Sequence, residues 1–287
     1  MRVALIHRYP VKSMGGERLD AAFLGPAGIP GDRAWALRDE VSGGLTGAKK
    51  HARLMSLNAS FLAEPDADTP SPAVRITDGH GLDVTSASGD VDARLSAALD
   101  HPVSLWPLLP PDRLDHYRRE AAAPGTDRLA ALRELFGRTP DEPLPDLTRF
   151  PSLLATYHSP PGTYFDAYPL LIMTRASLDA LTRGAAAGGI DARFDVRRFR
   201  PNLLLETDQE GFVENAWDGR RLRIGDAEVQ VEMPCPRCIM TTHGFADLPR
   251  DPRVMRALVR CNDGNLGVYA SVVKPGRVAP GDRVELL

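Results

Sequence analysis

The chain has 287 residues, of which 43% are hydrophobic and 25% are charged, and this is ample for one large or two modest domains with a buried core. A formal net charge of −3 and a pI near 6.2 leave no overall basic character, so nucleic acid is not expected as a main partner. No run approaches the roughly 18 apolar residues of a membrane helix, so no membrane association is expected either.

The N-terminal end and the cysteine content predict an intracellular protein. Residues 1–6 lead directly into an apolar run typical of a strand, so we expect no signal peptide and predict a cytoplasmic location. Three cysteines are too few for a disulfide framework. In a reducing compartment, so few cysteines indicate a ligand or a catalytic group.

The N-terminal third is predicted to be mostly strand. Short apolar runs separated by Gly and Pro turns predict strands at Arg2–Arg8, Glu17–Leu24, Ala34–Arg38 and Leu54–Phe61. Two further runs, Val74–Ile76 and Leu82–Val84, flank Asp78-Gly79 in the manner of a hairpin. Val91–Leu99 has the apolar spacing of a short helix.

A Pro-rich and charge-rich stretch from 107 to 150 precedes a second β-rich half. We interpret this stretch as an inserted connector that carries one helix, Asp127–Phe136. Two more helices are predicted at Arg175–Arg183 and Arg253–Arg260. Strands are predicted at Leu203–Glu206, Arg221–Ile224, Glu228–Met233, Leu266–Val273 and Arg283–Leu287. The chain is therefore predicted to be a β-rich α+β protein with a few helices.

The most unusual chemistry lies in Cys235-Pro-Arg-Cys238, directly after the strand predicted at Glu228–Met233. Arg237 stands between the two cysteines, and a nearby cation favours a thiolate over a thiol. A thiolate is a nucleophile and also a ligand for soft metals. The alternative is that both cysteines are simply small buried residues.

Two other roles for the pair match the sequence incompletely. A zinc site could begin with Cys235, Cys238 and His243, but Cys261 lies 17 intervening residues further along the chain, where it does not complete the pattern. A thioredoxin-like motif needs a helix after the first cysteine. Residues 239–244 are rich in β-branched side chains and end in Gly, which makes a poor helix start. Cys261 is expected to be a core residue.

Five separated motifs give the chain a family resemblance. They are Tyr9–Ser13, Gly31–Trp35, Phe199–Asn202, Cys235–Thr242 and Gly281–Leu287. Together, and in this order, they resemble the MOSC family with its MOSC N-terminal β-barrel domain, whose members include the amidoxime-reducing components and their bacterial counterparts. The resemblance implies an N-terminal β-barrel-like domain over 1–106, a connector over 107–150 and a MOSC β-barrel domain over 151–287.

The resemblance also implies a molybdenum cofactor (Mo-pterin) held between the two domains. Cys238 matches the thiolate that is the molybdenum ligand and catalytic group, which leaves Cys235 as a neighbour. The positions that match cofactor-contacting motifs are Lys12, Ser13, Arg33, Arg200 and Asn202, with looser matches at Thr174, Ser177 and Tyr269. Fixed cations and donors suit a phosphate-bearing pterin. Arg200 precedes Pro201 and is therefore expected to be extended.

The activity implied by the resemblance is a two-electron reduction of small N-hydroxylated compounds. The sequence has no cysteine spacing for an iron–sulfur cluster, so the electrons are expected from a separate flavin, haem or iron–sulfur protein. The alternative in this family is a protein that binds or carries the cofactor, or assists its sulfuration. A non-catalytic zinc or scaffold protein is a third possibility.

Several polar residues near these motifs remain open. Thr46–His51 resembles an active-site loop of the family's N-terminal domain, and fits a solvated basic turn equally well. His243 departs from the family pattern just beyond the ligand, which leaves the substrate open, and a lone loop histidine is expected to be exposed. His7, His101 and His158 show no spacing that predicts a metal site.

Overall fold

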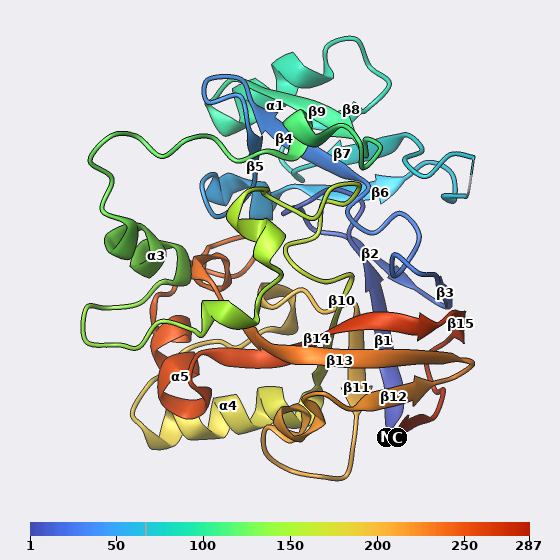
Figure 1. The fold of residues 1–287 in the computed structure, drawn as a ribbon, viewed down its shortest axis with the longest axis vertical. Helices are drawn as coiled ribbons and strands as arrows, with labels where there is room; N and C mark the ends of the chain where they lie inside the picture. The colour runs from blue at the N-terminus through green and yellow to red at the C-terminus, as the bar shows by residue number, and fades with distance from the viewer. Residues whose placement is uncertain (67) are drawn as a thin grey trace.

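Eight strands form one large sheet in the computed structural model, which describes residues 1–66 and 68–287. In sheet order they are β16 (Val284–Leu286), β12 (Arg221–Ile224), β13 (Ala227–Pro236), β14 (Asn265–Lys274), β10 (Leu170–Thr174), β11 (Leu203–Glu206), β1 (Arg2–Arg8) and β2 (Glu17–Leu19). β10 and β11 are parallel, and the other neighbours are antiparallel. The first strand of the chain therefore lies in a sheet built mainly from its second half (Figure 1).

Seven of these strands close into a barrel. The start of β1 is bridged to Arg283 through Arg2, on the side away from β11. Val3 N donates to Asp282 O at 2.9 Å, and Val284 N donates to Met1 O at 2.9 Å. Because β16 thereby meets β1, the barrel is closed at this point, and Met1 lies beside the start of β16 (Figure 1).

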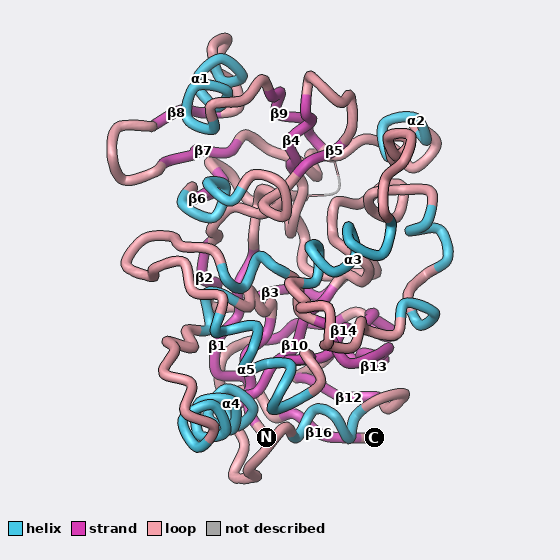
Figure 2. The backbone as a smooth tube through the Cα atoms, turned by 90° about the vertical axis from the view of Figure 1, so that its left-hand side faces the viewer, coloured by secondary structure: helices cyan, strands magenta, loops and turns pink. Residues whose placement is uncertain are grey.

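Alternating side chains fill the barrel, as the period of two along a strand requires. The buried cluster inside includes Val3, Ile6, Ile172, Leu203, Leu222, Val229, Val231, Val268 and Val284. The helices α4 (Arg175–Ala187) and α5 (Arg253–Asn262) cover the outer face at one side of the barrel (Figure 2). They bury Leu181, Ala185, Val254 and Leu258 against Met173, Leu204 and Leu266.

The N-terminal region forms a second layer of small sheets with its own core. One contains β5 (Leu45–Thr46), β4 (Trp35–Asp39) and β9 (Val103–Pro107), and another contains β6 (Asn58–Phe61), β7 (Val74–Thr77) and β8 (Asp83–Thr85). The helix α1 (Val91–Leu99) and the 3-10 turn η1 (Ala52–Ser56) pack there. β3 (Ala22–Leu24) pairs with β15 (Gly276–Val278) and joins the chain's two halves.

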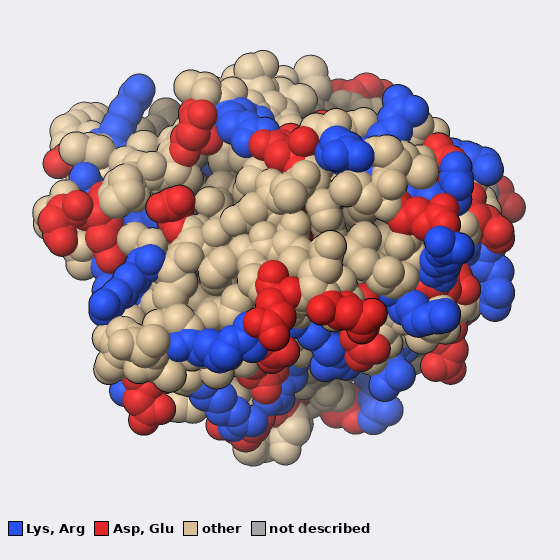
Figure 3. Space-filling model, turned by 90° about the horizontal axis from the view of Figure 1, so that it is seen from below, with Lys and Arg blue, Asp and Glu red and all other residues tan. Residues whose placement is uncertain are grey.

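The stretch after β9 carries two short helices, α2 (Leu114–Tyr117) and α3 (Arg128–Phe136). The remaining 3-10 turns are η2 (Leu147–Arg149), η3 (Ser152–Ala155), η4 (Val196–Arg198), η5 (Val213–Trp217) and η6 (Ile239–Thr242). Within the described ranges 1–66 and 68–287, none of the helices combines the length and apolar content that a bilayer crossing requires. Seen from below, acidic and basic side chains alternate around one face without a large basic patch (Figure 3).

The β-rich α+β class is confirmed. The second half of the chain supplies most strands of a closed barrel, as expected from the resemblance to a MOSC domain. Two strand predictions are wrong in detail. The region 17–24 forms two strands in different sheets, and the region 54–61 begins as the turn η1 before β6. β10 was not predicted, because it is buried on both faces and has no polar alternation to mark it. The domain boundaries at 106 and 150 stay a prediction.

Candidate functional site

Cys238 stands where β13 gives way to η6, with its backbone held on both sides. Arg237 N donates to Gly264 O at 2.8 Å, and Thr241 Oγ1 donates to Cys238 O at 3.1 Å. The Cys238 side chain is partly exposed, whereas Cys235 is only 1% exposed. Of the two cysteines in the motif, Cys238 is therefore the one that a ligand can reach.

Arg237 donates a hydrogen bond to Cys235, but this contact does not make the Cys235 thiol more acidic than usual. Its Nη1 donates to Cys235 Sγ at 3.1 Å, and its Nη2 donates to Phe199 O at 2.5 Å. Burial raises the pKa of Cys235 above its ordinary value, and the opposing effect of Arg237 does not overcome it. The expectation of an arginine-stabilised thiolate is thus wrong for Cys235, which is a buried thiol.

The zinc pattern suggested by the sequence does not assemble. Among the described residues, Cys235, Cys238 and His243 do not form a group of converging ligand atoms. His243 is buried, contrary to the expected exposure, and its Nε2 donates to Ala48 O at 2.8 Å. Cys261, expected to be a core residue, is only partly buried and packs against the cluster between α4 and α5.

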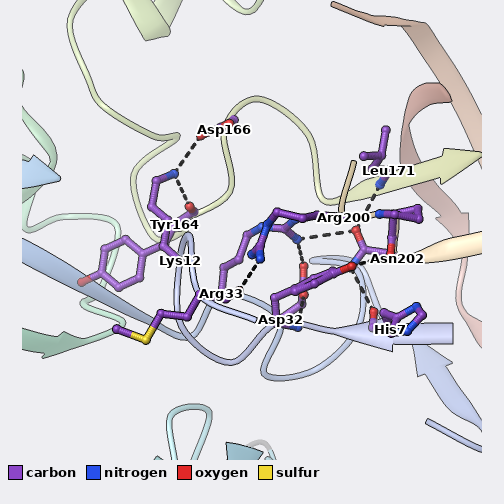
Figure 4. A network of polar contacts seen from close by, with 12 residues as sticks. His7, Lys12, Asp32, Arg33, Tyr164, Asp166, Leu171, Arg200 and Asn202 are labelled. Carbon is purple, nitrogen blue, oxygen red and sulfur yellow. Dashed lines mark hydrogen bonds and ion pairs between the residues drawn. The ribbon is translucent and has the colours of Figure 1, made fainter. Parts of the chain in front are cut away.

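Two lysines from the N-terminal region converge on one carboxylate from the second half. Lys12 Nζ lies 3.0 Å from Asp166 Oδ1, and Lys49 Nζ lies 3.3 Å from Asp166 Oδ2. Lys12 Nζ also donates to Tyr164 O at 2.6 Å (Figure 4). Burial would raise the pKa of Asp166, but the two lysines hold it well below its usual range. Burial would lower the pKa of Lys49, but Asp166 and, to a smaller extent, Cys238 raise it, so Lys49 lies within electrostatic reach of Cys238.

Two arginines enclose the ring of Tyr9 next to this group. The Arg200 guanidinium lies 4.1 Å from the ring centroid and that of Arg33 lies 5.2 Å from it. Arg33 pairs with Asp32, and Arg200 Nη1 donates to Met14 O. Arg200 Nη2 is buried and has no hydrogen-bond partner within residues 1–66 and 68–287. Burial lowers the pKa of Arg200 to about 10. An unpaired buried donor of this kind calls for an acceptor that the described side chains do not supply.

Ser13, Arg33 and Arg200 share a left-handed backbone, with φ of +72°, +53° and +56°. Residues other than Gly rarely adopt this conformation, and it concentrates at functional sites. The extended conformation expected for Arg200 is therefore wrong. The stacking on Tyr9 and the bond to Met14 O override the local preference set by Pro201.

Ser13 and Asn202 fix the walls of the site. Ser13 Oγ accepts from Ala48 N at 2.9 Å, which holds the loop that carries Lys49. Asn202 is fully buried, with its Oδ1 accepting from Leu171 N at 3.1 Å and its Nδ2 donating to His7 O at 3.3 Å. Asn202 Oδ1 is also 3.5 Å from Arg33 Nη1 (Figure 4). Asn202 therefore ties the cluster to β1 and β10, and Ser13 ties it to the loop of Lys49.

Tyr269 approaches the motif from β14, where it pairs with Met233. Burial and the neighbouring Cys235 raise the pKa of Tyr269 well above its ordinary value. Tyr269 therefore stays a neutral phenol, and its hydroxyl is paired with Cys235 inside the motif.

Thr174 and Ser177 lie in a different network at the far end of β10. Thr174 Oγ1 accepts from Ser177 N at 3.0 Å and donates to Glu214 Oε2 at 2.9 Å. Ser177 Oγ also donates to Glu214 Oε2. In the part of the chain that the structure describes, no hydrogen bond or ion pair joins these residues to the lysine and arginine cluster. Their side chains are accounted for by capping α4.

The sequence reasoning missed Asp166 and the buried link from His243. Asp166 lies in an aromatic stretch that carries no ligand spacing, so only the fold brings it to Lys12. For the loop 46–51 the sequence fits an active-site loop and a basic turn equally well. Its Lys49 reaches Asp166, and its Ala48 accepts from His243.

Two family models match the chain: "MOSC N-terminal beta barrel domain" over residues 1–100 and "MOSC domain" over residues 160–285. Mitochondrial amidoxime reducing component 2 of Homo sapiens is 36% identical over a region that covers 42% of this chain and only 38% of that protein. Mitochondrial amidoxime-reducing component 1 of Mus musculus is 24% identical, over 99% of this chain and 82% of that protein. The solved YUAD protein of Bacillus subtilis aligns over 99% of this chain and 94% of its own, at 13% identity and a TM-score of 0.42.

Proposed function

The chain belongs to the MOSC family, with a MOSC N-terminal domain ahead of the MOSC domain, and on that premise we propose that it is a molybdenum-cofactor enzyme that reduces N-hydroxylated compounds. The names of its relatives, amidoxime-reducing components, support this reaction class. The observation that carries the proposal is a cationic cluster, with an unpaired buried Arg200 donor, next to the accessible Cys238.

The residues present fit such a cofactor. The cluster holds four cations, Lys12, Lys49, Arg33 and Arg200, against the carboxylates of Asp32 and Asp166, which leaves an excess of positive charge for an anionic ligand. Arg200 Nη2 would gain an acceptor from a phosphate or a pterin oxygen. Cys238 would hold the metal, since a thiolate is the soft ligand that molybdenum takes.

The cofactor would supply two-electron redox chemistry, and the protein would supply position and charge. Lys12, Arg33 and Arg200 would bind and orient the anionic part, with Tyr9 holding the two guanidinium groups in place. Ser13 and Asn202 would keep the surrounding loops rigid. His243 would not deliver a proton to substrate, because its Nε2–H is committed to Ala48 O.

Repeated turnover needs an electron donor. The sequence provides three cysteines, too few for both a metal ligand and an iron–sulfur cluster, so the proposal includes a separate flavin, haem or iron–sulfur protein. A cytoplasmic location stays a prediction.

The test uses protein expressed in a host that makes molybdenum cofactor. Metal analysis should give about one molybdenum with pterin per chain, and dithionite-reduced protein should convert one equivalent of benzamidoxime to benzamidine without a partner. The Cys238→Ser variant should convert none. Zinc without pterin would contradict cofactor binding. Loaded protein that leaves benzamidoxime unchanged, yet reconstitutes an apo-molybdoenzyme, would support the cofactor-carrying alternative.

A further inference from the structure

A second group of ligand-type side chains lies in the N-terminal region, apart from the Cys238 site. Asp39, His51 and His101 each offer one ligand atom, and these atoms all lie within 4.8 Å of one another. We propose that these three residues bind a divalent transition-metal ion of the zinc type. Nothing in the proposed reductase reaction requires this site, so the two proposals stand or fall separately.

Three separate segments supply the ligands. Asp39 ends β4, His51 immediately precedes η1, and His101 lies in the turn between α1 and β9. The pairing of Asp39 with Val103 brings the β4 end next to the turn that carries His101. His101 N donates to Ser96 O at 3.1 Å, which fixes that turn. The fold therefore fixes the position of His101 relative to Asp39.

The Asp39 carboxylate is fully buried and already oriented. Its Oδ1 accepts from Val41 N at 2.9 Å and from Ser42 N at 3.0 Å. Backbone donors of this kind fix the direction of a carboxylate and are typical partners of metal-binding carboxylates. The second oxygen, Oδ2, faces the ammonium group of Lys50. A cation therefore already stands at the oxygen that is free of backbone donors.

One imidazole nitrogen contacts this carboxylate, and the other is buried without a hydrogen bond. His101 Nε2 lies 3.0 Å from Asp39 Oδ1, whereas His51 Nε2 lies 3.8 Å from Asp39 Oδ2 and finds no hydrogen-bond partner among the described residues. The two rings are close, with centroids 4.6 Å apart. A metal ion held by all three side chains would give the His51 nitrogen a partner and would bridge His101 and Asp39.

The chemistry of the donor set selects the class of ion. Two imidazoles and one carboxylate suit zinc and its neighbours, whereas magnesium and calcium prefer oxygen ligands alone. Three protein ligands leave a further position for water. Lys50 can vacate the site, because its side chain is 55% exposed and has room to turn into solvent.

The ion would connect this region to the candidate site. His51 lies two residues beyond Lys49, and His51 N and Lys50 N both donate to Gly47 O within the same loop. Fixing His51 therefore limits the movement of the segment that presents Lys49 to Asp166. The role expected for the ion is to hold the loop, since the Asp39 side of the group is closed to solvent.

The test is a titration of chelator-treated protein with Zn²⁺, and with Co²⁺ as a coloured probe. We expect one Zn²⁺ per chain at this site, and a Co²⁺ spectrum without the thiolate charge-transfer band that binding to Cys238 would give. His101→Gln and His51→Gln should each weaken binding by roughly a hundredfold or more, since each removes a ligand. His80→Gln, at an exposed histidine of the same region, is the matched control and should bind as the parent does.

Stability provides a second readout that separates binding from misfolding. Added Zn²⁺ should raise the unfolding midpoint of the parent and of His80→Gln, but not of His101→Gln, with circular dichroism confirming that each variant is folded. Lys50→Gln should tighten binding by about tenfold, because it removes the competing ammonium. Equal Zn²⁺ affinity in the parent and His101→Gln, or no binding in either, would overturn the proposal and leave Asp39 as the centre of an ion-pair cluster.

Discussion

His243 Nε2 donates a hydrogen bond to the carbonyl oxygen of Ala48 at 2.8 Å, across the boundary between the second half of the chain and its N-terminal region. His243 directly follows η6, the turn that begins after Cys238, and Ala48 directly precedes Lys49. Ser13 Oγ accepts from the N–H of the same Ala48. One peptide segment is therefore held from both halves, and it presents a cation next to the proposed metal ligand.

The burial of His243 should make stability depend on pH. Burial lowers the pKa of His243 below the value of about 6.5 that it has when unfolded, although the hydrogen bond to Ala48 O opposes this lowering, and Arg250 adds to it. A lowered folded-state pKa means that the stabilisation is complete above pH 6.5 and is lost as the pH falls through the folded pKa. His243→Gln keeps an N–H donor for Ala48 O but cannot titrate. The free energy of unfolding should therefore fall less between pH 7.5 and pH 5 in the variant than in the parent.

Urea unfolding at several pH values measures this difference. His80→Gln, at an exposed histidine, controls for the loss of a titrating group elsewhere and should follow the parent. Identical pH profiles for His243→Gln and the parent would show that the buried imidazole is not coupled to folding.

The two cysteines of the motif should respond differently to substitution. Cys238→Ser should abolish cofactor retention and reductase activity, because Cys238 is the accessible thiol. Cys235→Ser should keep most of both, at a cost of about 1 kcal/mol in stability, since a serine hydroxyl can still accept from Arg237 at this buried position. Molybdenum content, activity and urea unfolding of the two variants provide the measurement. Equal loss of activity in both would instead indicate a dithiol role.

The sequence predicted local features of this protein better than contacts between distant segments. Strands such as β1, β12 and β13 follow from alternation and turn residues. No local pattern, however, shows that β1 pairs with β11 or closes the barrel against Arg283. The motifs identified Cys238, Lys12, Arg33 and Arg200, because a family resemblance links positions that are far apart in the sequence.

Side chains outside those motifs could not be assigned in the same way. The ion pairs of Asp166 and the convergence of His51 with His101 depend on segments that meet only in the fold. Thr174 and Ser177 are ambiguous for a different reason. A Thr followed three residues later by Ser fits a helix cap as well as a ligand pair, and the Arg175–Ala187 helix uses it as a cap.

Thr174→Ala should therefore lower stability without removing cofactor. The change deletes the cap of α4 and one of the donors to the buried Glu214 carboxylate, which together should cost about 2 kcal/mol. Thr182→Ala, at an exposed position of the same helix, is the matched control and should cost less. Chemical unfolding and molybdenum analysis of both variants test this. A loss of cofactor at unchanged stability would support the cofactor role that the sequence suggested.

Arg200→Met should have opposite effects on stability and on cofactor binding. The buried guanidinium contacts a carbonyl and an aromatic ring rather than a carboxylate, and its Nη2 has no hydrogen-bond partner in the described part of the chain. A charge buried in this way destabilises the cofactor-free protein, so an apolar side chain of similar volume should leave the unfolding midpoint equal or higher. The same change removes a cation from an anionic ligand, and cofactor content should fall. Arg53→Met, at an exposed arginine, should alter neither quantity. Full cofactor occupancy in Arg200→Met would show that the unpaired donor does not face the cofactor, and the role proposed here for the cluster would then fail.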